Sequence, residues 1–133
     1  MSGAGALAPA LRDAARMVAR VAAGRSLADQ WRARDDTMAQ TSRAALLDLT
    51  HGTLRLYGKV QAIVSSLSRR GTPDALVEAL LWCSLYATES GRYAEYTVVD
   101  QAVRACGLLE RWTAKGYVNG LLRTWLRERG AIE

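Results

Sequence analysis

The sequence predicts a small all-α protein, folded as a single domain over residues 1–133. Three observations lead to this class. Apolar residues recur at steps of three and four along most of the chain, which is the period of an α-helix. The 133 residues are 50% hydrophobic, enough to bury one core. Cap and stop signals divide the periodic stretches into successive helices.

The first two helices are expected within residues 7–34. An apolar stripe predicts a first helix that closes at Gly24. A short second helix follows, because Ser26 and Asp29, three residues apart, resemble a capping box that starts a helix and turns Leu27 and Trp31 inward. The stripe of the first helix consists of Leu7, Leu11, Ala14, Val18 and Val21.

The middle of the chain predicts one long amphipathic helix of about thirty residues. Asp36 and Thr37 are suited to cap its start, and the run 69–71 (Arg-Arg-Gly) supplies a basic last turn and a glycine stop. A kink is expected near Gly52 or Gly58. The apolar positions are Leu46, Leu49, Thr53, Leu56, Val60, Ile63 and Leu67.

Three further segments complete the predicted bundle. Residues 72–74 (Thr-Pro-Asp) provide a cap, a proline at the first helical position and an acid in the first turn, so a helix is expected over 75–87. That helix is apolar nearly all round and should be central. Residues 93–103 combine strand propensity with helical spacing, and we assign them to a helix. A last helix is expected over about 113–129.

Composition and motifs indicate neither an enzyme nor a cofactor-binding protein. No segment has the length of a membrane span or the pattern of a secretory signal, so a cytoplasmic location is expected. Cys83 and Cys106 lie far apart in apolar stretches, which favours core packing over a disulfide or metal site. A lone histidine, here His51, seldom makes a catalytic base, so a partly buried structural role is favoured. The alternative is a contribution to a basic surface with Arg55 and Lys59. No glycine-rich phosphate loop is present.

Positive charge carries most of the functional information. The net charge is +5 with a pI near 9.7, and only two of the 18 basic residues are lysines. This balance favours an acidic partner, although a GC-rich genome would also enrich arginine. Basic residues recur every four positions on the polar face of the first helix and form a ridge that is suited to track RNA phosphates, with Trp31 or Tyr117 as stacking faces. The alternative is a merely solvated helix face. The candidate RNA-binding residues are Arg12, Arg16, Arg20, Arg25, Lys115 and Arg123.

Three segments together resemble the NusB family over nearly the whole chain. They are Leu49-Thr50-His51-Gly52-Thr53-Leu54-Arg55, Tyr96-Thr97-Val98-Val99-Asp100-Gln101-Ala102-Val103 and Lys115-Gly116-Tyr117-Val118-Asn119-Gly120-Leu121-Leu122-Arg123. The resemblance implies a helical bundle of two packed sub-bundles. It also implies one of two settings: a stand-alone transcription antitermination factor that binds leader RNA with a small ribosomal protein, or the N-terminal domain of an RsmB-type ribosomal RNA cytosine-5 methyltransferase.

The two settings differ in what they imply for this chain. Residues 24–29 and 99–103 look more like the methyltransferase branch, whereas the length is that of the stand-alone factor. Antitermination factors open their first helix with a dense basic cluster, which Asp13 interrupts here. The methyltransferase requires a downstream catalytic domain, so the chain as given is expected not to methylate RNA. A protein-docking module, on that domain or a small ribosomal protein, is the rival function.

Asn119 and Gly120 are expected to serve structure rather than RNA binding. Both have below-average helix propensity, so a compensating interaction is expected. Asn119 is suited to hydrogen-bond the end of a neighbouring helix. Gly120, four residues after Gly116, would let that helix approach the backbone closely.

Overall fold

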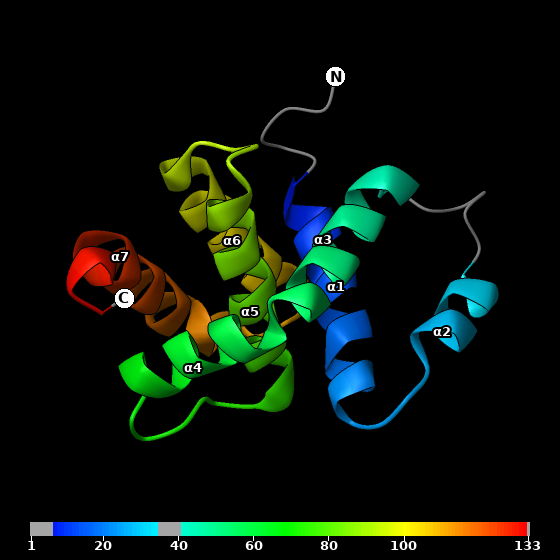
Figure 1. The fold of residues 1–133 in the computed structure, drawn as a ribbon, viewed down its shortest axis with the longest axis horizontal. Helices are drawn as coiled ribbons and strands as arrows, with labels where there is room; N and C mark the ends of the chain where they lie inside the picture. Colours follow the sequence, from blue (N-terminus) through cyan, green and yellow to red (C-terminus); the bar gives the residue numbers. More distant parts are fainter. Residues whose placement is uncertain (1–6, 35–40, 133) are drawn as a thin grey trace.

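The computed structural model describes residues 7–34 and 41–132, and every regular element in those ranges is helical (Figure 1). The all-α class predicted from the sequence is therefore confirmed. None of the helices described is long and apolar enough to cross a membrane. In chain order the elements are α1 (Leu7–Ala22), α2 (Leu27–Ala33), α3 (Arg43–Arg55), α4 (Tyr57–Leu67), α5 (Ala75–Ser90), α6 (Glu95–Leu108), the 3₁₀ helix η2 (Trp112–Ala114) and α7 (Lys115–Ile132).

Helix α5 is the centre of the bundle, as its apolar sequence predicts. It contacts α1, α3, α4, α6 and α7, and every residue from 79 to 88 is buried. In Figure 1, α1, α2 and α3 lie to the right of α5, whereas α4 and α7 lie to its left. The two groups of helices therefore share α5 as a common core element. Each leucine fully buried there contributes about 1.5–3 kcal/mol relative to an exposed one.

Helix α1 is held rigidly by its buried face. Leu11, Ala14 and Val18 are fully buried where α1 packs on α3, α5 and α6. The Ala8 N–H, one of the donors that a helix start leaves unpaired, donates to Gln101 Oε1 of α6 at 3.1 Å. The helix stops before Gly24, whose φ of +100° is a conformation that glycine adopts without steric cost. The opposite face of α1 is thus a fixed platform.

The prediction of a single long helix in the middle of the chain is wrong, because the structure has two helices there. The Ser42 side chain accepts from the Ala45 N–H at 3.3 Å and caps α3. The expected caps Asp36 and Thr37 lie outside the described residues. The chain breaks at Leu56, between the two expected kink sites, where its N–H bonds the carbonyls of both Gly52 and Thr53. Since α4 ends at Leu67, residues 69–71 follow the helix instead of forming its last turn.

The later helices agree with the predicted positions but differ in detail. Asp74 itself caps α5 by accepting from the Val77 N–H at 2.8 Å, so Pro73 precedes the helix rather than opening it. The helix also continues past the predicted end at Ala87 to Ser90. The helical assignment of 93–103 is confirmed by α6, whose core face carries the buried residues Val98, Val99, Gln101, Ala102, Ala105 and Cys106.

A close helix contact occurs at Gly52 of α3. A Cβ atom built on Gly52 would lie only 2.1 Å from Cζ of Tyr86 on α5. The Tyr86 ring is buried, and its hydroxyl donates to Asp48 Oδ1 at 2.5 Å. Glycine is therefore required at this position by packing, since any side chain would displace an anchored ring.

The close approach expected at Gly116 and Gly120 does not occur. No described atom lies within 4 Å of a Cβ built on either glycine, so the prediction that another helix packs there is wrong for this part of the chain. Asn119 Oδ1 accepts from Arg123 Nε at 3.1 Å on its own helix, not from a neighbouring helix end. Both glycines are exposed on the outer side of α7, which the helical period alone did not reveal.

Candidate nucleic-acid interface

An open groove of about 1360 Å³ lies between α1 and α2 and contains the predicted basic ridge. Arg12, Arg16 and Arg20 line its α1 wall, and Arg25 lines it from the turn that leads to α2. Four of the six candidate RNA-binding residues therefore share one surface, and Arg34 joins them. The remaining lining residues are Asp13, Met17, Ala23, Gly24, Ser26, Asp29, Gln30, Ala33 and Leu46.

The regular spacing of the ridge follows from the helix. Positions four residues apart lie on one face, about 6 Å apart along the axis. Arg16, Arg20 and Arg25 are exposed, and none of them forms an ion pair with a carboxylate among the described residues. Their guanidinium groups are thus directed to solvent from a rigid backbone. Such a row is a ready partner for a chain of phosphates.

Asp13 positions the first arginine of the row. Arg12 Nε donates to Asp13 Oδ1 at 2.9 Å, and Thr41 Oγ1 donates to Asp13 Oδ2 at 2.7 Å. Burial alone would raise the pKa of Asp13, but these hydrogen bonds and the charges of Arg12 and Arg16 outweigh it. The pKa therefore lies below its ordinary value of 3.8. In the sequence Asp13 only interrupts the ridge, whereas in the structure it connects α1 to the residues before α3.

The depressed pKa predicts a pH-dependent stability. A carboxylate with a lowered pKa in the folded state stabilises the protein above its unfolded pKa and loses that contribution as the pH falls through the lowered value. Asp13→Asn should cost about 1–2 kcal/mol at pH 7, because it removes charge-assisted hydrogen bonds. The difference in the free energy of unfolding between parent and variant should narrow progressively as the pH falls below 3.8.

Urea denaturation at a series of pH values measures this gap. Glu128→Gln is the matched control, because Glu128 pairs with Arg127 at 3.4 Å on an exposed surface. That variant should change the free energy of unfolding by less than about 0.5 kcal/mol. A gap for Asp13→Asn that stays constant from pH 7 into the acid range would contradict the ionised hydrogen-bonded carboxylate.

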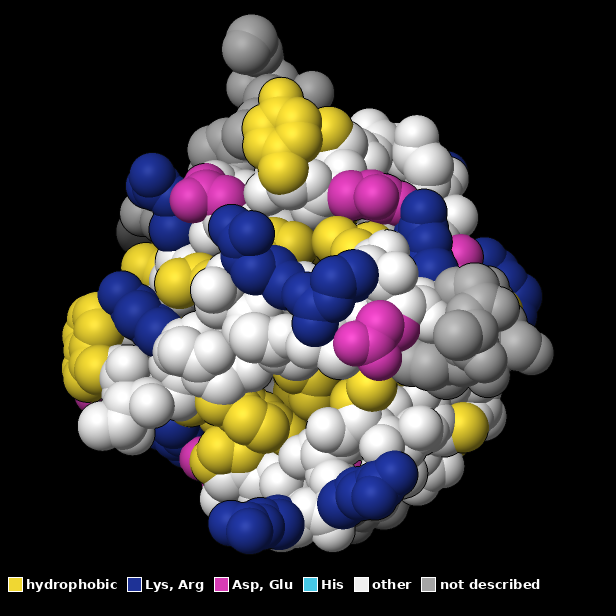
Figure 2. All heavy atoms as spheres, turned by 90° about the vertical axis from the view of Figure 1, so that its left-hand side faces the viewer, with side chains coloured by type: hydrophobic (Ala, Val, Ile, Leu, Met, Phe, Trp, Pro, Cys, Tyr) yellow, Lys and Arg dark blue, Asp and Glu magenta, His cyan; other side chains and the backbone are white. Residues whose placement is uncertain are grey.

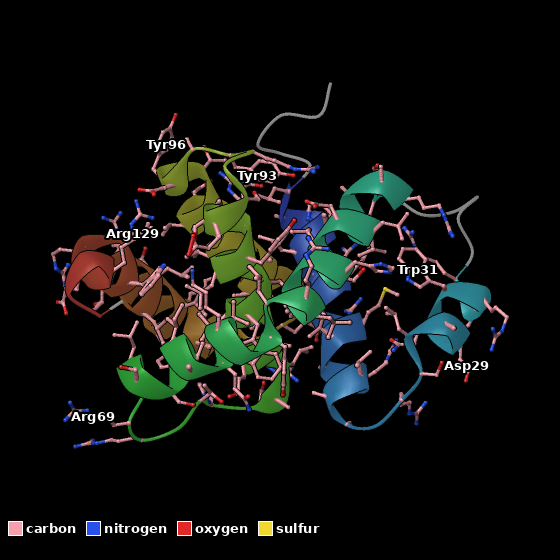
Figure 3. All side chains as sticks on the ribbon, viewed as in Figure 1. Asp29, Trp31, Arg69, Tyr93, Tyr96 and Arg129 are labelled. Atoms are coloured by element: carbon pink, nitrogen blue, oxygen red, sulfur yellow. The ribbon has the colours of Figure 1, made fainter. Side chains whose placement is uncertain are left out.

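The two aromatic residues expected as stacking faces are engaged in packing. The guanidinium carbons of Arg34 and Arg43 lie 5.8 and 4.6 Å from the ring centroid of Trp31, which points from α2 toward α3 (Figure 3). The Arg43 contact thus links Trp31 to the first residue of α3, whereas Arg34 is the C-cap residue of α2 itself. Tyr117 is half-buried, and its hydroxyl shares a 2.5 Å hydrogen bond with Ser68.

Lys115 and Arg123 do not join the ridge. They line a second groove of about 950 Å³ between α6 and α7, and α7 and α2 lie at opposite ends of the long axis (Figure 1). Lys115 Nζ lies 5.1 Å from the centroid of Trp112. On the side of the molecule that carries α7, basic side chains alternate with acidic and hydrophobic ones (Figure 2). The structure therefore separates the six candidates into two surfaces.

The two buried cysteines are unsuited to act as nucleophiles. Burial raises the pKa of the Cys83 thiol to about 12, and burial is also the main cause of the raised pKa of Cys106. Both thiols are protonated core residues, as their apolar surroundings predict. His51 is exposed on α3, so the partly buried role expected for it is wrong. Within residues 7–34 and 41–132, no three His, Cys, Asp or Glu side chains are grouped as metal ligands.

Comparison with known proteins places the chain in a family. The model of the NusB family matches residues 9–127, a range that contains most of the helices lining the two grooves. The chain belongs to the NusB family. This confirms the resemblance inferred from the three motifs. No solved structure gives a significant match.

Curated relatives of this NusB-family chain are ribosomal RNA methyltransferases. "Ribosomal RNA small subunit methyltransferase B" of Pseudomonas putida is 30% identical over 118 residues, covering 86% of this chain and 27% of the relative. The protein of the same name from Pseudomonas syringae is 30% identical over 73% of this chain and 22% of its own length. "Probable ribosomal RNA small subunit methyltransferase B" of Coxiella burnetii is 28% identical over 68% and 22%. The chain thus spans about a quarter of the relatives that it matches.

Gln101 lies within one of the three motifs, but its role as a positioning residue of this NusB-family domain was not predicted. It is only 3% exposed and orients the start of α1, the helix that carries the arginine row. The signal available in the sequence was its spacing, because Gln101 falls three residues after Val98 and four before Ala105 on a buried helix face. A buried polar group in such a place requires a hydrogen-bond partner.

Proposed function

We propose that this chain is a non-catalytic RNA-binding module and that the groove between α1 and α2 is its RNA surface. The observation that carries the proposal is the row formed by Arg16, Arg20 and Arg25, three exposed arginines that pair with no described carboxylate. Guanidinium groups bind phosphate oxygens through paired donors. Arg16 and Arg20 lie on a core-packed helix, and Arg25 lies in the turn that follows, where its N–H bonds the Arg20 carbonyl. Binding therefore orders little of the protein and loses little conformational entropy.

The relatives favour ribosomal RNA as the ligand over a transcript leader. Their names specify a ribosomal RNA methyltransferase, and this chain covers only 22% to 27% of their length. We propose that the chain corresponds to a substrate-binding part of such an enzyme, working in the cytoplasm beside a methyltransferase domain. Antitermination with a small ribosomal protein is the alternative setting.

A protein-docking role has one observation in its favour. The exposed large hydrophobic residues Tyr96, Leu108 and Trp112 all lie in α6 or η2, away from the arginine row. Exposed aromatic side chains are common anchors in protein interfaces. We therefore assign protein docking, if this chain performs it, to the α6–α7 side, and RNA binding to the opposite end.

A charge-matched pair of triple variants tests the RNA surface. Arg16→Ala/Arg20→Ala/Arg25→Ala should bind a short RNA hairpin with an unpaired tail at least about tenfold more weakly than the parent. It should also flatten the plot of log affinity against log salt by about 2 to 3, because three phosphate contacts are lost. Its melting temperature should hardly change, since these side chains point away from the core. Filter binding at several salt concentrations gives both quantities.

The control variant is Lys115→Ala/Arg123→Ala/Arg127→Ala, which removes the same charge from the α6–α7 groove. It should weaken binding by less than about threefold through the long-range field alone. Equal losses of RNA affinity in both variants would mean that binding depends only on net charge. Unchanged affinity in the Arg16→Ala/Arg20→Ala/Arg25→Ala variant would show that the α1–α2 groove does not bind RNA. A selective loss in the control would move the RNA surface to Lys115 and Arg123.

A further inference from the structure

The α1–α2 groove contains arginines but no aromatic face on which a base can stack. None of its described lining residues is aromatic, and residues 35–40, which connect α2 to α3, include no aromatic residue in the sequence. Trp31, on the same short helix, is covered by Arg34 and Arg43. Tyr96, which is 79% exposed, lies at the other end of the molecule (Figure 3).

The absence of an aromatic face matters because stacking on aromatic side chains is what lets proteins prefer single strands. Each base stacked on an aromatic side chain contributes about 1–3 kcal/mol to single-strand binding. A site without that contribution depends on phosphate contacts. Double-stranded RNA is recognised in this way, through the shape of its helix, its phosphates and its 2′-hydroxyls.

The electrostatic contribution itself favours the double helix. Counterion release scales as about 0.9 per phosphate contact on a duplex, taking the B-DNA value, and about 0.7 on a single strand. For three to four phosphate contacts, the slopes of log affinity against log salt for the duplex and the single strand differ by about 0.6 to 0.8. Lowering the salt from 1 M to 0.1 M therefore gives the duplex a relative gain of about four- to sixfold.

We infer that the α1–α2 groove binds a double-helical segment of RNA through its sugar–phosphate backbone, largely independent of base sequence; this inference rests on the proposed RNA-binding function. Arg16, Arg20 and Arg25 contact successive phosphates of one strand, and Asp13 keeps Arg12 aligned with them. The fixed positions of Arg16 and Arg20 on α1, with Arg25 in the turn that follows, suit a backbone whose phosphates are already regularly spaced. The flexible phosphates of a single strand must first be ordered, at an entropic cost.

The test uses a blunt RNA duplex and each of its two strands alone, with strand sequences that do not self-pair. Fluorescence anisotropy of the labelled RNAs is measured at three salt concentrations. Between 1 M and 0.1 M salt the affinity for the duplex should rise about fivefold more than the affinity for either strand, because its salt slope is steeper. A second duplex with the same base pairs in permuted order should bind within about twofold of the first.

The variants separate failure of this inference from failure of the proposed function. Arg16→Ala/Arg20→Ala/Arg25→Ala should remove the duplex preference, and Lys115→Ala/Arg123→Ala/Arg127→Ala should retain it. Single strands that bind as tightly as the duplex, yet weaken in the first variant, overturn the duplex inference and leave RNA binding by the groove in place. Affinities for both RNAs that the first variant leaves unchanged overturn the proposed function itself.

Discussion

Gly52→Ala is expected to destabilise the protein by about 2–3 kcal/mol, even though alanine favours helix. The new Cβ would lie 2.1 Å from the Tyr86 ring, which is buried and tied to Asp48. Displacing the ring costs about 1–3 kcal/mol in strain and weakens a hydrogen bond of similar worth, against a helix-propensity gain of about 1 kcal/mol. Urea denaturation followed by circular dichroism measures the difference.

Gly58→Ala is the matched control, because Gly58 lies in the next helix and a Cβ atom there would have no described atom within 4 Å. That variant should be stabilised by about 0.5–1 kcal/mol. Adding Tyr86→Leu to Gly52→Ala should cost less than the sum of the single changes, since the smaller side chain leaves room for the methyl group. Additive losses would show that the Gly52–Tyr86 contact is not the cause.

Trp125→Ala is expected to cost about 3–5 kcal/mol, a large share of the stability of a domain this size. Trp125 is fully buried on α7, the helix that packs on α4, α5 and α6. Trp125→Phe should lose less, about 1–2 kcal/mol, because a phenyl ring still fills most of the site. The buried indole N–H that it removes has no hydrogen-bond partner within the described residues. The phenylalanine variant keeps the test decisive if the alanine variant fails to fold.

Trp112→Ala applies the same chemical change at a site that is 62% exposed. Its expected cost is below about 1 kcal/mol, since the ring packs only partly, against Gly107 and Lys115. Thermal melts of the two alanine variants give the comparison directly. Similar losses at both positions would contradict the burial difference on which the prediction rests.

Local sequence signals predicted the helices well where the deciding interaction is itself local. Ser26 caps α2 through the Asp29 N–H, and Gly24 ends α1 in a left-handed conformation, both as expected. A kink was expected near Gly52 or Gly58 and the chain breaks between them at Leu56, but the division into two helices was not predicted because the apolar period continues through it. Each half of that stretch satisfies the same apolar pattern, and in the structure α3 and α4 each pack on α5.

The candidate site divides in the same way. Arg12, Arg16 and Arg20 share a face because they are four residues apart on one helix, which is a property of the chain alone. Arg25 joins them through the turn that ends α1, where its N–H bonds the Arg20 carbonyl at 2.8 Å, and Lys115 and Arg123 are excluded because α7 packs at the other end of the bundle. Distances between helices depend on tertiary packing and not on the spacing of residues along the sequence.

By itself, the sequence determined the helical class, the Ser26 cap of α2, the central position of α5, the arginines of α1 that share one face, and the family. These follow from periodicity, propensity and motif, which act over a few residues or are read directly from the chain. Only the tertiary structure decided that Gly52 rather than Gly120 meets another helix, that Trp31 is covered by arginines, and that Asp13 aligns Arg12 through Thr41. Each of these depends on atoms brought together from distant positions, and the free energy of such contacts is set by packing that no local pattern records.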